Sequence, residues 1–152
     1  KKIFETYEGE AATMFINVKD IRKIKFDENF FLYFEEIDLC KTVIHKKGQI
    51  LIDKNIVVEH DGGGSVSTQF QHDLDKNRNW HWMWSSFYFH KKHKGFFISL
   101  AIIFPKLISA ISKFLLYKIL NNTKLQEIYY CRLSGILNSI KGNKSWYRPR
   151  LN

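Results

Sequence analysis

The C-terminal half of the sequence combines a strong positive charge with long apolar runs. Residues 66–152 hold 14 lysines and arginines against 3 aspartates and glutamates, a net charge of +11, whereas residues 1–65 have a net charge of −2. A segment that is both basic and apolar is typical of a protein that binds an anionic membrane surface. Its basic residues alternate with stretches too apolar for a solvated groove, so nucleic acid is not an expected partner.

Two apolar runs, residues 96–104 and 107–120, dominate this half. A helix needs about 20 mostly apolar residues to span a membrane. Lys106 and Lys113 are seven residues apart and share a helical face with Ser109, which favours an amphipathic helix on the membrane surface over a transmembrane span. Packing of the apolar face on the protein's own core is the alternative.

The remaining segments show shorter patterns separated by turn signals. We expect a strand over 11–17, helices over 18–24 and about 34–46, and Gly48 as a helix stop. Two strands joined by a turn should follow, over 49–53 and 55–60. A polar, irregular stretch is expected over 61–79, helices over 80–94 and 128–140, and a polar tail over 142–152.

Three acids, Glu35, Glu36 and Asp38, lie at the start of the helix expected over 34–46, directly behind the aromatic run FFLYF. Acids in a first helical turn are favoured by the helix dipole, so charge compensation is one explanation. Adjacent carboxylates beside large aromatic rings are also how an enzyme holds a partly desolvated base, with its proton affinity adjusted by a neighbour. The residues alone leave both explanations open.

Two other motifs bear on metal binding. His60 ends the β-rich run IVVEH beside a glycine triplet, where it is either a hydrogen-bonded structural residue or a metal ligand. Asp73-Leu74-Asp75 has the DxD form that many sugar-nucleotide enzymes use to hold a cation. It lies in a polar segment without a preceding strand, so a chance match is favoured.

Residues 26–65, FDENFFLYFEEIDLCKTVIHKKGQILIDKNIVVEHDGGGS, resemble the bacterial rhamnosyltransferase-like branch of family 2 glycosyltransferases. The aromatic run, the acid pair, the triplet Asp38-Leu39-Cys40 and the spacing to His60 all fall into register with that branch. Weaker similarity covers residues 9–25 and the pieces NWHWMWSSFYFHKKHKG and RLSGILNSIKGNKSWYRP.

The resemblance implies an α/β fold, in which residues 1–79 are the distal half of a GT-A (Rossmann-like) catalytic domain. Residues 80–152 would form a basic, helical region associated with the membrane. The implied activity is an inverting glycosyltransferase that moves a sugar, such as rhamnose, from a nucleotide-sugar donor to a lipid-linked or polysaccharide acceptor. The enzyme would act peripherally at the cytoplasmic face of the inner membrane, in cell-surface glycan synthesis.

The resemblance also implies roles for individual residues. The second acid of the family's pair is the general base, which here is Glu36, with Glu35 as its neighbour on the acceptor side. His60 corresponds to a histidine that completes a divalent-metal site in some relatives, so Mg²⁺ or Mn²⁺ is the expected cofactor. We expect the acceptor to contact Asp38. We also expect Trp80, His81 and Trp82 to line the acceptor entrance, because sugar rings stack on aromatic side chains.

Two departures from the family pattern matter. Glu36 replaces the usual Asp and is one methylene longer, although both carboxylates have similar reference acidity. The family's nucleotide-binding half and its DxD motif lie upstream of the matching residues, so this chain alone is expected to lack donor binding and to be inactive by itself. The alternative is a non-catalytic membrane- or lipid-binding fragment, in which the acids only compensate the helix dipole.

Overall fold

The computed structural model describes residues 3–5, 14–17, 24–53, 55–58 and 68–148. The chain divides into two compact units. One comprises Lys1–Glu28 and Phe34–Gly64, and the other comprises Asn29–Tyr33 and Ser65–Asn152. The predicted boundary between residues 79 and 80 falls inside a continuous helix of the second unit, Gln71–Lys94.

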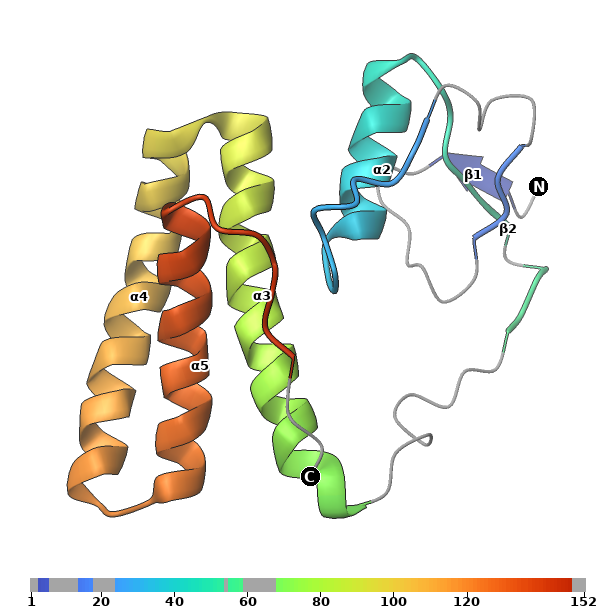
Figure 1. The fold of residues 1–152 in the computed structure, drawn as a ribbon. Coiled ribbons are helices and arrows are strands. Elements are labelled where there is room, and N and C mark those ends of the chain that lie inside the picture. The colour runs from blue at the N-terminus through green and yellow to red at the C-terminus, as the bar shows by residue number, and fades with distance from the viewer. Residues whose placement is uncertain (1–2, 6–13, 18–23, 54, 59–67, 149–152) are drawn as a thin grey trace. The chain divides into compact units, whose positions relative to one another are not determined.

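The first unit contains a pair of short strands and one helix among its described residues (Figure 1). Strand β1 (Ile3–Glu5) pairs antiparallel with β2 (Leu51–Asp53), with Phe4 opposite Ile52. Helix α2 (Glu35–His45) confirms the helix expected over about 34–46. Its acidic first turn and the histidine in its last turn both match the direction of the helix dipole.

Helix α2 ends in a tight capping turn that depends on Lys47 and Gly48. Lys47 has a φ of 61° and donates its backbone N–H to the Ile44 carbonyl at 2.9 Å. Gly48 donates to the Val43 carbonyl at 2.9 Å, and an added Cβ there would lie 2.7 Å from Val43 Cγ1. This is the hydrogen-bond pattern of a Schellman motif, in which Lys47 takes the left-handed position that glycine usually occupies and the predicted stop residue Gly48 follows it.

The second unit is a bundle of three long helices (Figure 1). A 3₁₀ turn, η1 (Thr68–Phe70), leads into α3 (Gln71–Lys94), which is followed by α4 (Phe96–Ile119) and α5 (Thr123–Ile140). Gly95 links α3 to α4 with a φ of 85°, a left-handed value that a residue without Cβ adopts readily. The side chain of Asn122 caps α5 by accepting from the Leu125 N–H at 3.1 Å.

The core of this unit is built on one face of α3. Trp80, Met83, Trp84 and Phe87 follow the spacing i, i+3, i+4, i+7, and all four are buried. Met83 and Phe87 cluster with Ile103 of α4 and Ile136 of α5, while Trp80 and Trp84 cluster with Cys131 of α5. The apolar stripe of α3 therefore packs against both α4 and α5.

Helices α3 and α5 approach each other closely at Gly135. A Cβ added at Gly135 would lie 2.3 Å from the backbone oxygen of Trp80. One turn further along α5, the hydroxyl of Ser139 donates to the Trp84 carbonyl at 2.9 Å. The two helix backbones can approach this closely only because the side chains between them are absent or small.

The predicted GT-A (Rossmann-like) α/β fold is wrong. Helices dominate the described residues, and the sheet among them is the antiparallel pair β1–β2, so they contain no parallel sheet. Of the two strands expected over 49–53 and 55–60, the first corresponds to β2, which pairs with β1. Residues 55–58 are β-rich in composition but are exposed and form no strand. Residues 59 and 60 lie outside the described part of the chain.

Other predicted boundaries also shift. Residues 68–79 were expected to be irregular but form η1 and the first turns of α3, and α5 begins at Thr123, before residue 128. Polar contacts at helical spacing stabilise the start of α3: Gln71 Nε2 donates to Asp75 Oδ1 at 3.0 Å, and Asn79 Nδ2 donates to the Asp75 carbonyl at 2.8 Å. Residues 14–17 form no strand, and most of the helix expected over 18–24 lies outside the described residues.

We expect Gly135→Ala to destabilise the bundle. Alanine is the better helix former by about 1 kcal/mol, but its methyl group would collide with the Trp80 carbonyl, which belongs to a helix backbone and cannot rotate away. The net loss in the free energy of unfolding should be about 1–3 kcal/mol, measured by urea denaturation with circular dichroism. Ser112→Ala, on the exposed side of α4, is the matched control and should be neutral or slightly stabilising. Equal stability of both variants would contradict the close contact.

Candidate catalytic site

The aromatic run ahead of the acid cluster is docked on α3, within the three-helix unit. Phe30 is buried and its ring meets Tyr88 edge-on, with 4.9 Å between centroids. The hydroxyl of Ser85 donates to the Leu32 carbonyl at 2.8 Å, and Tyr33 meets Trp82 at 5.2 Å. Residues 29–33 therefore have a defined conformation fixed by α3, and they are not a free linker.

The backbone then turns through two consecutive left-handed residues. Tyr33 has a φ of 68° and Phe34 a φ of 71°. Bulky side chains rarely adopt such values, and each costs roughly 1–3 kcal/mol that the surrounding structure must offset. Phe34 is also the N-cap residue of α2 and provides no side-chain cap. Strained residues of this kind cluster at functional sites, and here the strain directly precedes Glu35 and Glu36.

Glu35 and Glu36 are partly shielded carboxylates. Each has one oxygen, Oε2, that is inaccessible to solvent and has no hydrogen-bond partner in the described structure. Burial raises the pKa of Glu35, its own backbone N–H lowers it, and the negative charge of Glu36 raises it. For Glu35, this is the environment in which a carboxylate gains proton affinity.

Asp38 differs from the other two acids. Its side chain is 1% exposed, and its backbone carbonyl accepts a hydrogen bond from Thr42 Oγ1 at 2.9 Å. Its proposed contact with an acceptor stays a prediction. His60 and the glycine triplet lie outside the described residues, so the structure does not place the predicted metal ligand relative to Glu36.

The three residues predicted to line an acceptor entrance point in different directions from α3. Trp80 and His81 are fully buried, and Trp80 Nε1 donates to Ser134 Oγ at 3.1 Å. Trp82 is 45% exposed and is the member of the group with ring surface open to solvent. Successive helical residues are about 100° apart, so one helix does not present all three to the same ligand.

His81 is the anchor of a C-terminal strap, which we define as residues 143–148. Its Nε2 lies 2.9 Å from the Tyr147 carbonyl and its Nδ1 lies 2.9 Å from Ser145 Oγ. A neutral ring with the proton on Nε2 satisfies both contacts, donating to Tyr147 and accepting from Ser145. The predicted polar tail is thus packed structure up to Arg148.

The strap also reaches the aromatic run. The Arg148 guanidinium stacks on the ring of Phe31, 3.3 Å from its centroid, and Phe31 contacts His81 with 4.9 Å between ring centroids. Trp84 Nε1 donates to the Asn143 carbonyl at 3.0 Å. One local signal of this packing is present in the sequence, since Trp146 and Tyr147 are large aromatic residues in an otherwise polar tail.

A polar network joins the starts of α3 and α5, and sequence reasoning missed it. His72 Nε2 lies 2.9 Å from Glu127 Oε2, and Lys76 lies 3.4 Å from the same oxygen and 2.7 Å from Asp73 Oδ1. The hydrogen bond from His72 lowers the pKa of Glu127, with Lys76 adding to the effect. Residues 55 positions apart in the sequence make this contact, so no local pattern indicates it.

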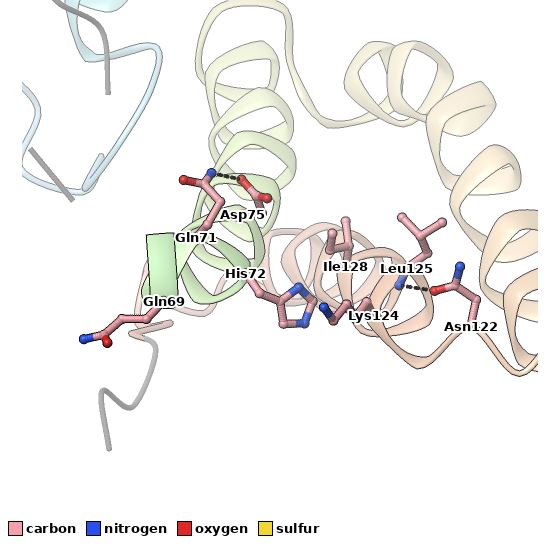
Figure 2. Close-up of a pocket in the computed structure, with 8 residues that line it drawn as sticks. All are labelled: Gln69, Gln71, His72, Asp75, Asn122, Lys124, Leu125 and Ile128. Atoms are coloured by element: carbon pink, nitrogen blue, oxygen red, sulfur yellow. Dashed lines mark hydrogen bonds between the residues drawn. The ribbon is translucent and has the colours of Figure 1, made fainter. Parts of the chain in front are cut away.

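A pocket of about 500 Å³ lies beside this network (Figure 2). Figure 2 shows His72 extending from α3 toward Lys124 at the start of α5. Its lining comprises Gln69, Gln71, His72, Asp75, Asn122, Lys124, Leu125 and Ile128. Neither Glu35 nor Glu36 contributes to it, so it is separate from the acid cluster.

The DxD motif does not fit a metal site. Asp73 pairs with Lys76 and Asp75 accepts from Gln71, so the two carboxylates have different partners. Residues two apart on a helix lie about 200° apart around the axis and do not converge on one ion. In the described part of the chain, no group of three or more His, Cys, Asp and Glu side chains could hold a metal ion.

Comparisons of this chain with protein-family models, with curated proteins and with solved structures found no match.

We expect the bundle to lose stability as the pH falls below about 6.5 because of His81. Burial lowers the pKa of His81, the hydrogen bond to Tyr147 opposes this, and the Arg148 charge lowers the pKa further. As the pH falls, the unfolded chain therefore binds a proton at His81 before the folded chain does. The stability that His81 contributes is complete above the pKa of 6.5 in the unfolded chain, and it is lost as the pH falls through the lower pKa of His81 in the folded chain.

Melting temperatures between pH 7.5 and 5.0 test this prediction. His81→Gln should lower the melting temperature at neutral pH and flatten its decline toward acid. His72→Gln is the matched control, because that histidine is partly exposed and should leave the acid decline in place. An unchanged acid decline in His81→Gln would show that another group is responsible.

Proposed function

We propose that this chain contributes the general base to an inverting glycosyl transfer, with Glu36 as the base and Glu35 as its charged neighbour. The observation that carries the proposal is the shielded acid pair that follows the left-handed turn at Tyr33 and Phe34. The resemblance of residues 26–65 to rhamnosyltransferase-like enzymes assigns the same two acids. The GT-A fold is not part of the proposal.

The environment of the pair suits a base that accepts a proton from a hydroxyl group. Glu35 and Glu36 each keep one carboxylate oxygen whose capacity to accept a hydrogen bond is unused, whereas an oxygen already bonded to a cation or an N–H has none to spare. For Glu35, partial burial and the neighbouring charge of Glu36 both favour the protonated form and raise its pKa.

The proposed chemistry is a single displacement. Glu36 removes the proton from an acceptor hydroxyl while that oxygen forms a bond to the anomeric carbon of the donor sugar. The bond from the anomeric carbon to the phosphate oxygen breaks, its electron pair leaves with the nucleoside diphosphate, and the anomeric configuration inverts. No residue of the chain becomes covalently attached.

The proposal assigns fewer roles to the other predicted groups. Trp82 has ring surface available to stack on a sugar, whereas Asp38 is buried and is assigned no acceptor contact in the proposal. A divalent cation, Mg²⁺ or Mn²⁺, would neutralise the leaving diphosphate, but the described residues do not assemble a site for it, and no step is assigned to it. Binding of the nucleotide-sugar donor is not assigned to any residue described above.

We expect Glu36→Gln to lower sugar transfer by at least about 100-fold, since general-base catalysis contributes roughly 10²–10⁴-fold. The assay uses the protein as its gene encodes it, with a panel of nucleotide-diphosphate sugars and a membrane lipid extract as acceptor. Release of nucleoside diphosphate and incorporation of labelled sugar are both measured. Donor affinity should change little, because the amide preserves the shape of the side chain.

Two further variants make the test specific. Glu28→Gln, an exposed glutamate shortly before the aromatic run, is the matched control and should retain full activity. Glu35→Gln should reduce the rate by a smaller factor than Glu36→Gln. Loss of activity in Glu35→Gln with normal activity in Glu36→Gln would reassign the base to Glu35, and full activity in both would reject the proposal.

A non-catalytic membrane-binding fragment is the second candidate. The observation in its favour is the apolar face that α4 leaves exposed, with Phe97 84% and Ile119 78% accessible. Wild-type protein that binds lipid but transfers no sugar from any donor would favour this candidate.

A further inference from the structure

Helix α4 has two apolar faces, and only one of them is used by the bundle. Ser99, Ile103 and Ala110 are buried against the other helices. On the opposite side lies what we call the outer face, whose members repeat at helical spacing and are all exposed. They are Phe97, Phe104, Ile108, Ile111, Leu115 and Ile119. A continuous exposed apolar stripe of this length marks an interaction surface.

The charged residues on α4 and on the chain directly before and after it are all basic. No aspartate or glutamate occurs between Asp75 and Glu127, a stretch that contains all of α4. Exposed lysines flank both ends of the helix: Lys91, Lys92 and Lys94 before it, and Lys118 and Lys124 at its end and beyond. An apolar stripe with a basic border at both ends complements an anionic lipid surface, in which acyl chains lie beneath negative headgroups.

The same border disfavours a second copy of this chain as the partner. A symmetric contact through the outer face would bring the basic borders of two molecules together, and like charges brought together oppose association. A lipid surface has the opposite charge and needs no matching shape. The positive charge therefore favours an anionic lipid surface over a second copy of the chain as the partner of this face.

By length and composition α4 could also cross a membrane, with a mean hydropathy of 1.7 in its most apolar 18-residue window. The contacts of its inner face favour a helix that lies flat on the membrane surface instead. Ile103 belongs to the core cluster with Met83, Phe87 and Ile136, and Lys106 donates to Ser86 Oγ of α3 at 3.2 Å. A spanning α4 would separate these contacts, whereas a helix lying in the interface keeps them.

We propose that the outer face of α4 docks the three-helix unit flat on an anionic lipid bilayer, with its apolar side chains in the headgroup–acyl boundary. The flanking lysines lie near the lipid phosphates and supply the preference for anionic over neutral lipid. This docking is independent of the proposed sugar transfer, because it needs neither the acid pair nor a donor.

Vesicle co-sedimentation tests the proposal without any sugar substrate. Wild-type protein should bind vesicles containing phosphatidylglycerol more tightly than vesicles of phosphatidylcholine alone. Phe97→Ser with Ile108→Ser should weaken binding to the anionic vesicles by at least about tenfold, since two side chains no longer enter the bilayer. Lys91→Glu with Lys94→Glu should weaken it by at least about 25-fold, on the order of fivefold for each lysine lost near the surface.

The matched control removes two equally exposed apolar side chains from outside the bundle. Phe15→Ser with Ile56→Ser should bind vesicles like the wild type, because Phe15 and Ile56 are not on α4. Circular dichroism of each variant checks that the helices are intact, as expected for substitutions at exposed positions. The proposal is overturned if wild-type protein does not bind the anionic vesicles or if the outer-face variant binds as tightly as the control. It is also overturned if the outer-face substitutions abolish self-association, measured by light scattering, and leave vesicle binding unchanged.

Discussion

The contact on which the three-helix unit depends is the approach of α5 to α3 at Gly135. The carbonyl of Trp80 occupies the space that any other side chain at position 135 would need. This brings Cys131 and Ile136 of α5 within reach of the α3 stripe, and α4 completes the core through Ile103. Burial of these apolar side chains is the main favourable term, and the small residues at the crossing allow it.

Helix α3 also organises segments that have no regular structure of their own. Residues 29–33 and the C-terminal strap come from distant parts of the sequence, and both pack on α3. Phe31 links them, since it contacts His81 and lies under Arg148. The chain leaves this fixed segment at Tyr33, turns through Phe34 and begins α2 with the acid pair. Backbone strain is sustained where neighbouring contacts are strong enough to offset it, and the docked aromatic run supplies such contacts.

The sequence predicts most of the helices, but it does not predict where α3 and α5 begin. The helices α2 and α4 and the apolar part of α3 were predicted correctly because apolar spacing and glycine stops are local signals. The start of α3 was missed because its residues are polar, and their stabilising partners include Glu127 on α5. The partner of β2 was missed because β1 lies almost 50 residues away at Ile3. The acid pair was identified from the sequence, but its shielded oxygens and the raised pKa of Glu35 were not.

The sequence by itself determined the basic and apolar character of the C-terminal half, because charge and hydropathy are sums over residues. It also determined that Glu35 and Glu36 begin a helix behind an aromatic run. Only the tertiary structure decided which side of each helix is buried. Trp80, His81 and Trp82 are consecutive and similar in character, yet α5 and the strap cover the first two and leave Trp82 exposed. On α4, likewise, the packing of Ile103 against α3 and α5 decides that Phe104 faces outward.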